Sequence, residues 1–183
     1  MKKKLLIGFG VLVLIIGLGM MYLNNRNRTL SPPGQEVYKN NDLEITVNYS
    51  RPSVRGRLIF GSEANGALQP YGSYWRLGAN ESTQIIFNKD VLFNGNPLKA
   101  GTYKVYAVPG ANTFMVGIST EFDTWGYSEP DHSNDIFTTE IPVSYLTEPM
   151  EQFTVTITDA ENGGAIVYFT WSDVELGVPI TQN

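Results

Sequence analysis

The sequence predicts an all-β domain, an antiparallel β-sandwich with a jelly roll as one possible form, behind one N-terminal transmembrane helix. Three features support this: an apolar run at the N-terminus, short segments of alternating apolar and polar residues beyond it, and turn residues between those segments. No segment after Leu23 has the spacing of an amphipathic helix. Because helices are needed to cover a parallel sheet, the strands are expected to pair antiparallel.

The N-terminal segment predicts targeting to a membrane. Residues 2–4 are lysines, and residues 5–23 form an uninterrupted apolar run of nineteen residues. At about 1.5 Å per residue this run makes a helix of about 28 Å, close to the hydrocarbon thickness of a bilayer and longer than the usual apolar part of a cleaved signal peptide. We therefore expect residues 1–23 to stay as a signal anchor. The alternative is a secreted domain, released by cleavage near Gly19.

The flanking charges predict the orientation of this helix. The lysines and the free amine outweigh Arg26 and Arg28, so the N-terminus is expected in the cytoplasm and the domain on the exported, periplasmic or extracellular side. Residues 24–35, which contain prolines and asparagines, are expected as a linker, and residues 36–183 as a single domain. The chain has no cysteine, which excludes disulfides, thiolate metal sites and lipid attachment through an N-terminal cysteine.

Strands are expected wherever apolar and polar residues alternate, as they do over residues 43–49. Similar segments predict strands near residues 57–60, 74–77, 84–88, 102–108, 113–119, 136–143, 153–158, 165–171 and 175–179. Asn94-Gly95 is a strong signal for a two-residue hairpin turn, and Pro109-Gly110 marks a further reversal.

Charge is divided unevenly along the exported part. Residues 24–104 hold ten Lys and Arg against six Asp and Glu, whereas residues 105–183 hold twelve acids and neither Lys nor Arg. This acidic balance argues against nucleic acid and against anionic lipid as partners, because both require a basic face. One interpretation of the uneven charge is solubility. The alternative is that Arg51, Arg55, Arg57 and Arg76 pair with late acids in the fold.

Two segments, residues 49–61 and 70–82, concentrate arginines, hydroxyls, an amide and a carboxylate between glycines and prolines, which is typical of shaped loops. The guanidinium groups suit a carboxylate or a phosphate. The candidate ligand-binding residues are Arg51, Ser53, Arg55, Arg57, Tyr71, Arg76, Asn80 and Glu81. In the alternative interpretation, these arginines only brace loops by binding backbone carbonyls and acids.

Glu81 is the candidate general acid or base, since it follows a predicted strand end where functional side chains often project. A glycosidase would need a second carboxylate about 5 to 9 Å away, for which Glu63 and Asp90 are available. The structural alternative is a Glu81 carboxylate held by Arg76 or by backbone amides.

Residues 121–135 form an acidic segment around His132, the only histidine of the chain. One histidine without a Gly-x-Ser-x-Gly motif makes a serine hydrolase or a catalytic zinc site improbable. Calcium prefers such oxygen donors, and its weak candidates are Asp123, Asp131 and Asp135, against the alternative of a solvated acidic loop. No cofactor is expected. Tyr71, Tyr74 and the Trp125-Gly126-Tyr127 stretch either form exposed platforms for a sugar ring or belong to the core.

Several motifs resemble the domain of unknown function 2911 family. They are Tyr-Ser-Arg-Pro-Ser at residues 49–53, Gly-Arg-Leu-Ile-Phe-Gly at 56–61, Pro-Tyr-Gly at 70–72 with Trp-Arg at 75–76, Gly-Ala-Asn-Glu at 78–81, Ala-Gly-Thr-Tyr at 100–103 and Val-Pro-Ile at 178–180. The resemblance covers about residues 40–180 and implies an exported bacterial protein, soluble or anchored, without an established activity. The chain departs from the family pattern between residues 131 and 143, where an acidic segment replaces a more basic strand.

The expected function is therefore that of a non-catalytic, membrane-anchored module. It would bind a glycan, an anionic small molecule or an envelope protein through the two loop segments. The alternative is a hydrolase of the glycoside type that uses Glu81 as general acid or base.

Overall fold

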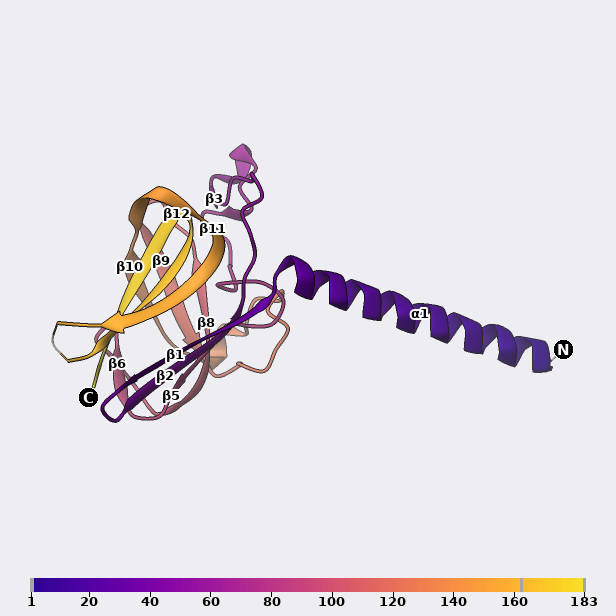
Figure 1. Cartoon of the computed structure of the whole chain (residues 1–183), viewed down its shortest axis with the longest axis horizontal. Helices are drawn as coiled ribbons and strands as arrows, with labels where there is room; N and C mark the ends of the chain where they lie inside the picture. The colour runs from indigo at the N-terminus through magenta and orange to yellow at the C-terminus, as the bar shows by residue number, and fades with distance from the viewer. Residues whose placement is uncertain (1, 162, 183) are drawn as a thin grey trace.

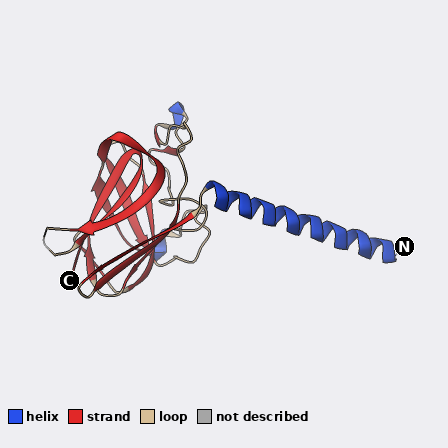
Figure 2. Cartoon of the chain, in the orientation of Figure 1, coloured by secondary structure: helices blue, strands red, loops and turns tan. Residues whose placement is uncertain are grey.

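The computed structural model describes residues 2–161 and 163–182, and it contains one long helix and two main β-sheets (Figures 1 and 2). Helix α1 (Lys2–Leu30) projects from the β-rich domain. Within it, Leu6–Leu30 is long and apolar enough to cross a membrane, which is compatible with a single-pass anchor or a signal sequence.

Helix α1 extends further than the sequence indicated. Residues 24–35, expected as a linker, are helical up to Leu30, and only Ser31 and Pro32 separate α1 from strand β1. The polar residues after Leu23 continue the helix at little cost, because asparagine and arginine tolerate helical backbone when exposed. The helix stops before Pro32, whose ring disfavours helical backbone at the preceding residue.

The larger sheet has six strands in the order β1-β2-β5-β8-β9-β10, and each adjacent pair is antiparallel. Its strands are β1 (Pro33–Asn40), β2 (Leu43–Ser50), β5 (Gln84–Phe87), β8 (Gly101–Val108), β9 (Thr113–Ser119) and β10 (Asp135–Pro142). β1 was not predicted, because its proline and glycine resembled a linker.

The smaller sheet has the order β11-β12-β6-β7 and is also antiparallel. Its strands are β11 (Ser144–Asp159), β12 (Ala165–Gln182), β6 (Val91–Phe93) and β7 (Asn96–Leu98). The predicted turn joins β6 to β7, with both Asn94 and Gly95 at positive φ (46° and 79°). The two strands expected near residues 165–171 and 175–179 are one strand, with Ser172 at a φ of 55° inside it.

One hydrophobic core lies between the sheets and confirms the sandwich-like, antiparallel all-β prediction. Its centre is aromatic: Trp75 stacks on Trp171 with ring centroids 5.8 Å apart, and Phe60 packs edge-on against both. Trp75 is only 3% exposed. It anchors the segment that leads into the candidate site.

Two expected strands are wrong, and both errors lie in the motif segments. Residues 74–77 form only a single bridge, between Trp75 and Ala107, instead of a strand. Residues 57–60 are mostly a loop, because Arg55 and Gly56 take positive φ values (51° and 67°) and turn the chain. Only a short parallel pair follows, β3 (Phe60–Gly61) with β4 (Gln69–Pro70), around the 3-10 turn η1 (Glu63–Asn65).

Candidate functional site

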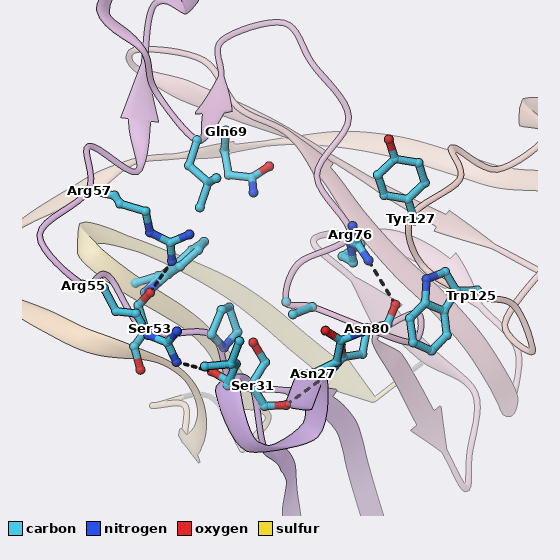
Figure 3. A pocket seen from close by; sticks show the side chains of 16 residues that line it. Asn27, Ser31, Ser53, Arg55, Arg57, Gln69, Arg76, Asn80, Trp125 and Tyr127 are labelled. Atoms are coloured by element: carbon cyan, nitrogen blue, oxygen red, sulfur yellow. Dashed lines mark hydrogen bonds between the residues drawn. The ribbon is translucent and has the colours of Figure 1, made fainter. Parts of the chain in front are cut away.

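The two motif segments meet at an open groove of about 390 Å³ beside the end of α1 (Figure 3). Five of the predicted site residues line it: Ser53, Arg55, Arg57, Arg76 and Asn80. Asn27, Leu30 and Ser31 contribute the helix end, and Trp125 and Tyr127 stand beside Arg76. We call this cavity the arginine groove.

A tight turn positions two of the arginines. Arg57 donates from Nε to the carbonyl of Val54 at 3.0 Å and from Nη2 to the carbonyl of Ser53 at 2.6 Å, which folds its side chain back along the turn. Arg55 donates from Nη2 to the carbonyl of Leu30 at 2.8 Å. Both side chains are exposed, on one side of the groove.

Arg76 approaches the groove from the opposite side and is half-buried. Its Nη1 donates to the carbonyl of Asn80 at 3.1 Å, and its guanidinium lies 5.5 Å from the centre of the Tyr127 ring. Burial lowers the pKa of Arg76 from its usual value, although the group stays charged because that value is so high.

Gly126 allows the loop between β9 and β10 to lie against this arginine. A Cβ at this position would come within 2.9 Å of the Glu81 carbonyl oxygen and 3.0 Å of the Arg76 Cδ. The loop also runs along residues 80–84, with Gly126 N–H bonded to the Asn80 carbonyl at 3.0 Å. This close approach places Trp125 and Tyr127 at the groove.

Asn80 is buried and connects the helix end to the groove through hydrogen bonds. Its φ is 58°, and its Nδ2 donates to the Ser31 carbonyl at 3.1 Å and weakly to the Ser50 hydroxyl at 3.5 Å. Asparagine tolerates this left-handed backbone better than most residues. The side chain is therefore engaged in holding the chain rather than free to meet a ligand.

The charge of the groove is not balanced by acids. No carboxylate lines it, and among residues 2–161 and 163–182 no carboxylate lies within 4.0 Å of the Arg55, Arg57 or Arg76 guanidinium. The carboxylate of Glu151 is near this turn, but it accepts from the backbone N–H of Arg55 at 3.0 Å. The expected pairing of early arginines with late acids is thus not formed in the described residues. The guanidinium groups bond neutral carbonyls, and because each carries five N–H donors, several remain for a ligand.

Three predicted site residues lie outside the groove. Arg51 instead bonds the second sheet, donating to the Phe153 carbonyl at 3.4 Å and to the Thr154 hydroxyl at 3.3 Å. Tyr71 begins the turn after β4, with its N–H on the Gly61 carbonyl. Arg51 is therefore held against the second sheet, whereas Tyr71 is 39% exposed.

Glu81 is the third, and it faces a separate hollow of about 580 Å³. Its Oε1 accepts from Arg28 of α1 at 2.5 Å, and its side chain is 43% exposed. Glu81 is the only acid among the described residues that line this hollow. Asp90 instead binds Lys99 and the N–H of Ala100. The second carboxylate that a glycosidase requires is not beside Glu81 among these lining residues.

Two of the three calcium candidates, Asp131 and Asp135, are engaged in hydrogen bonds. Asp131 caps the 3-10 turn η2 (His132–Asn134) by accepting from Ser133 N–H, and Asp135 accepts from the Tyr106 hydroxyl at 2.5 Å. His132 lies between Asp135 (2.7 Å) and Glu129 (3.1 Å), and the bond to Asp135, followed by that to Glu129, raises its pKa. In the described part of the chain, no group of three or more His, Asp or Glu side chains is placed to hold a metal ion, and this applies to Asp123 as well.

Lys104 was missed by sequence reasoning. It lies on the outer face of the larger sheet, is 1% exposed, and has its Nζ 5.5 Å from the centre of the Tyr74 ring. Burial lowers its pKa. The alternation of residues 102–108 predicted the strand and placed Lys104 on the same face as Thr102 and Tyr106. It did not predict that this lysine would be buried.

Comparison with known proteins gives one result. A family model described as "Protein of unknown function (DUF2911)" matches residues 31–180, which includes every residue of the two motif segments. Neither a curated protein nor a solved structure matches the chain.

Proposed function

The chain belongs to the DUF2911 family of proteins of unknown function, and from this premise we propose that its domain is a non-catalytic module that binds an anionic ligand in the arginine groove. One observation carries the proposal. Arg55, Arg57 and Arg76 direct three guanidinium groups to one cavity, and none of them has a carboxylate partner among the described residues.

Guanidinium groups in this arrangement select an oxyanion. Each offers a planar fork of donors that matches a carboxylate or a phosphate, and such charge-assisted bonds are stronger than neutral ones. The cavity of about 390 Å³ is large enough for an anion carried on a small organic body. Trp125 and Tyr127 offer that body an aromatic wall on the Arg76 side.

We further propose that α1 stays as a membrane anchor, with the lysines in the cytoplasm and the domain on the exported side. The apolar length of α1 and the charge balance of its flanks support this. Arg28, Arg55 and Asn80 tie the end of α1 to the domain. Binding would therefore take place next to the bilayer.

The glycoside-hydrolase alternative has no specific observation in its favour. Glu81 is held by Arg28, and the hollow that it faces contributes no second acid among its described lining residues.

The test is a thermal-shift titration of the full chain in an uncharged polyoxyethylene detergent, which brings neither sugar nor phosphate. Inorganic phosphate, a phosphorylated sugar, a carboxylate, calcium and a neutral glycan are compared. A ligand at a hundred times its Kd adds about 2.7 kcal/mol of stability, which is about 5–10 °C for a domain of this size. We expect the anions to raise the melting temperature and the neutral glycan to leave it unchanged.

Matched variants assign the effect to the groove. Arg55→Gln, Arg57→Gln and Arg76→Gln together remove three groove charges. Lys39→Gln, Lys89→Gln and Lys99→Gln together remove three exposed charges that are paired with acids elsewhere. The arginine variant is expected to lose the anion response and the lysine variant to keep it. Equal responses in both variants, or no anion response in the unaltered chain, would refute the proposal.

A further inference from the structure

We infer that the ligand of the arginine groove is the phosphate of a phospholipid headgroup, taken from the membrane that α1 spans. This inference depends on the proposed function, because it names the source of the anion. Four observations support it: the depth of the groove, its position beside the helix end, the residues around it, and the short connection to α1.

The depth of the groove follows from the length of α1. The apolar run ends at Leu23, and the helix residues that line the groove, Asn27 and Leu30, come four and seven positions later. At about 1.5 Å per residue these positions lie about 6 and 10 Å beyond the apolar run. The headgroup layer is about 5 to 7 Å thick on each side of the hydrocarbon core. With α1 across a bilayer, Asn27 would lie within the headgroup layer and Leu30 just outside it, so the base of the groove would lie at the outer edge of the headgroups.

The groove lies on the side of the domain from which the helix leaves. Figure 1 shows α1 leaving the domain beside the loop between β9 and β10, while the segment that contains β3 projects from the domain above it. In Figure 3 the end of the helix forms the floor of the groove, with Arg55 and Arg57 on one side and Arg76 on the other. The groove therefore lies directly beyond the helix end, close to the surface of any bilayer that α1 crosses.

The residues around the groove suit a membrane interface. Trp125 is 49% exposed and Tyr127 is 75% exposed, and Leu68, which also lines the groove, is 39% exposed. Leu58, which follows Arg57, is 48% exposed. Tryptophan and tyrosine prefer the headgroup level of a bilayer, where an apolar ring and a polar edge are both satisfied. An arginine groove flanked by such side chains has the composition of a lipid-contacting surface.

The connection between helix and domain keeps the groove at this depth. Arg55 binds the Leu30 carbonyl, Asn80 binds the Ser31 carbonyl and Arg28 binds Glu81. Because only Ser31 and Pro32 separate α1 from β1, the domain has little freedom to lift away. The groove would then be exposed to the high local concentration of headgroups in the bilayer, so modest intrinsic affinity is enough for high occupancy.

The acidic charge of the domain as a whole, which argued against anionic lipid, does not oppose this local contact. No Asp or Glu is among the described residues that line the groove. Charges more than about 10 Å away are largely screened at physiological salt. Zwitterionic lipids also carry a phosphate, so a net negative membrane is not required.

The experiment places the full chain in two kinds of nanodisc. One contains phosphatidylcholine with phosphatidylglycerol, and the other contains galactolipid, which has no phosphate. Quenching of tryptophan fluorescence by acrylamide, a neutral quencher, reports whether the groove is covered. Trp75 and Trp171 are 3% and 1% exposed, so the signal that acrylamide can reach comes from Trp125. Trp125→Phe gives the baseline.

In phospholipid nanodiscs we expect weaker quenching and a melting temperature several degrees higher than in galactolipid. The variant that carries Arg55→Gln, Arg57→Gln and Arg76→Gln is expected to lose both differences. The variant that carries Lys39→Gln, Lys89→Gln and Lys99→Gln is expected to keep them. Near-ultraviolet circular dichroism checks folding, and the single Arg76→Gln variant replaces the triple variant if that one does not fold.

The outcomes separate the inference from the proposed function. If inorganic phosphate stabilises the chain in detergent through the arginines but the two nanodiscs behave alike, the ligand is a free anion, and the inference is overturned while the function stands. If phosphate in detergent and phospholipid in nanodiscs are both without effect, both are overturned. If the difference in quenching between the two nanodiscs is the same in the arginine variant as in the unaltered chain, helix anchoring alone covers Trp125. The inference then fails.

Discussion

Arg55 donates a hydrogen bond to the carbonyl oxygen of Leu30 at 2.8 Å, so that an arginine of the groove binds the last residue of the membrane-type helix. The last carbonyls of a helix have no partner within it, and a cation near that end also interacts favourably with the helix dipole. The same side chain thus belongs to the groove and to the helix end.

Replacement of Arg55 by alanine is expected to loosen the helix end. The loss of one exposed charge-assisted bond should cost about 1 kcal/mol. Hydrogen exchange should become faster for the amides of residues 28–31, while the strands of the core keep their protection. The control is Lys39→Ala, which removes an exposed cation far along β1. Unchanged exchange near residue 30 would show that the bond does not hold the helix end.

Arg57→Lys is expected to weaken phosphate binding while the charge is kept. Lysine cannot form two parallel bonds to an oxyanion or bind the Ser53 and Val54 carbonyls at the same time. We expect affinity to fall about tenfold, which corresponds to about 1.4 kcal/mol. Titration of the full chain with inorganic phosphate in detergent measures it. Equal affinity would mean that only charge, and not the fork, matters at this position.

Gly126→Ala is expected to disturb the groove through its aromatic side. The new Cβ would meet the Glu81 carbonyl oxygen at 2.9 Å, so the loop must move away from Arg76. We expect a loss of about 1–3 kcal/mol in the free energy of unfolding, typical of overpacking, and weaker anion binding. Urea unfolding and phosphate titration measure the two effects. Normal stability together with normal binding would contradict the close approach.

Stability should depend on pH through His132. Hydrogen bonds to Asp135 and Glu129 raise its pKa in the folded state above the ordinary value of 6.5. The stabilisation is therefore complete below pH 6.5 and is lost as the pH rises through the higher folded-state pKa. Urea unfolding of the unaltered chain should show this decline, and His132→Asn should remove it. The same slope in both proteins would exclude His132 as its cause.

The sequence predicted most of the sheets because their strands depend on local alternation. Residues 113–119 were expected as a strand and form β9, and Asn94-Gly95 forms the expected hairpin. β1 escaped prediction because its stability comes from pairing with β2 along its whole length, not from its own composition. The strand expected at residues 57–60 failed because a positive φ at an arginine, as in Arg55, is rare and has no sequence signal.

The sequence predicted only part of the candidate site, because local motifs predict loops but not the long-range contacts that bring loops together. Ser53, Arg55, Arg57, Arg76 and Asn80 lie together at the groove, although their part in binding remains a prediction. Glu81 lies outside the groove and binds Arg28, which is 53 residues away in sequence. No local sequence pattern predicts such a pair. Trp125 and Tyr127 reach the groove only because the loop at Gly126 folds against residues 80–84.

The two-residue connection between α1 and β1 has a consequence for how the protein can meet other molecules. If α1 stays in a membrane as proposed, a tether this short leaves almost no slack, so the domain would diffuse in two dimensions within a thin layer above the bilayer surface. A soluble molecule would then have to approach that layer from the bulk, whereas a membrane component would reach it by lateral diffusion alone.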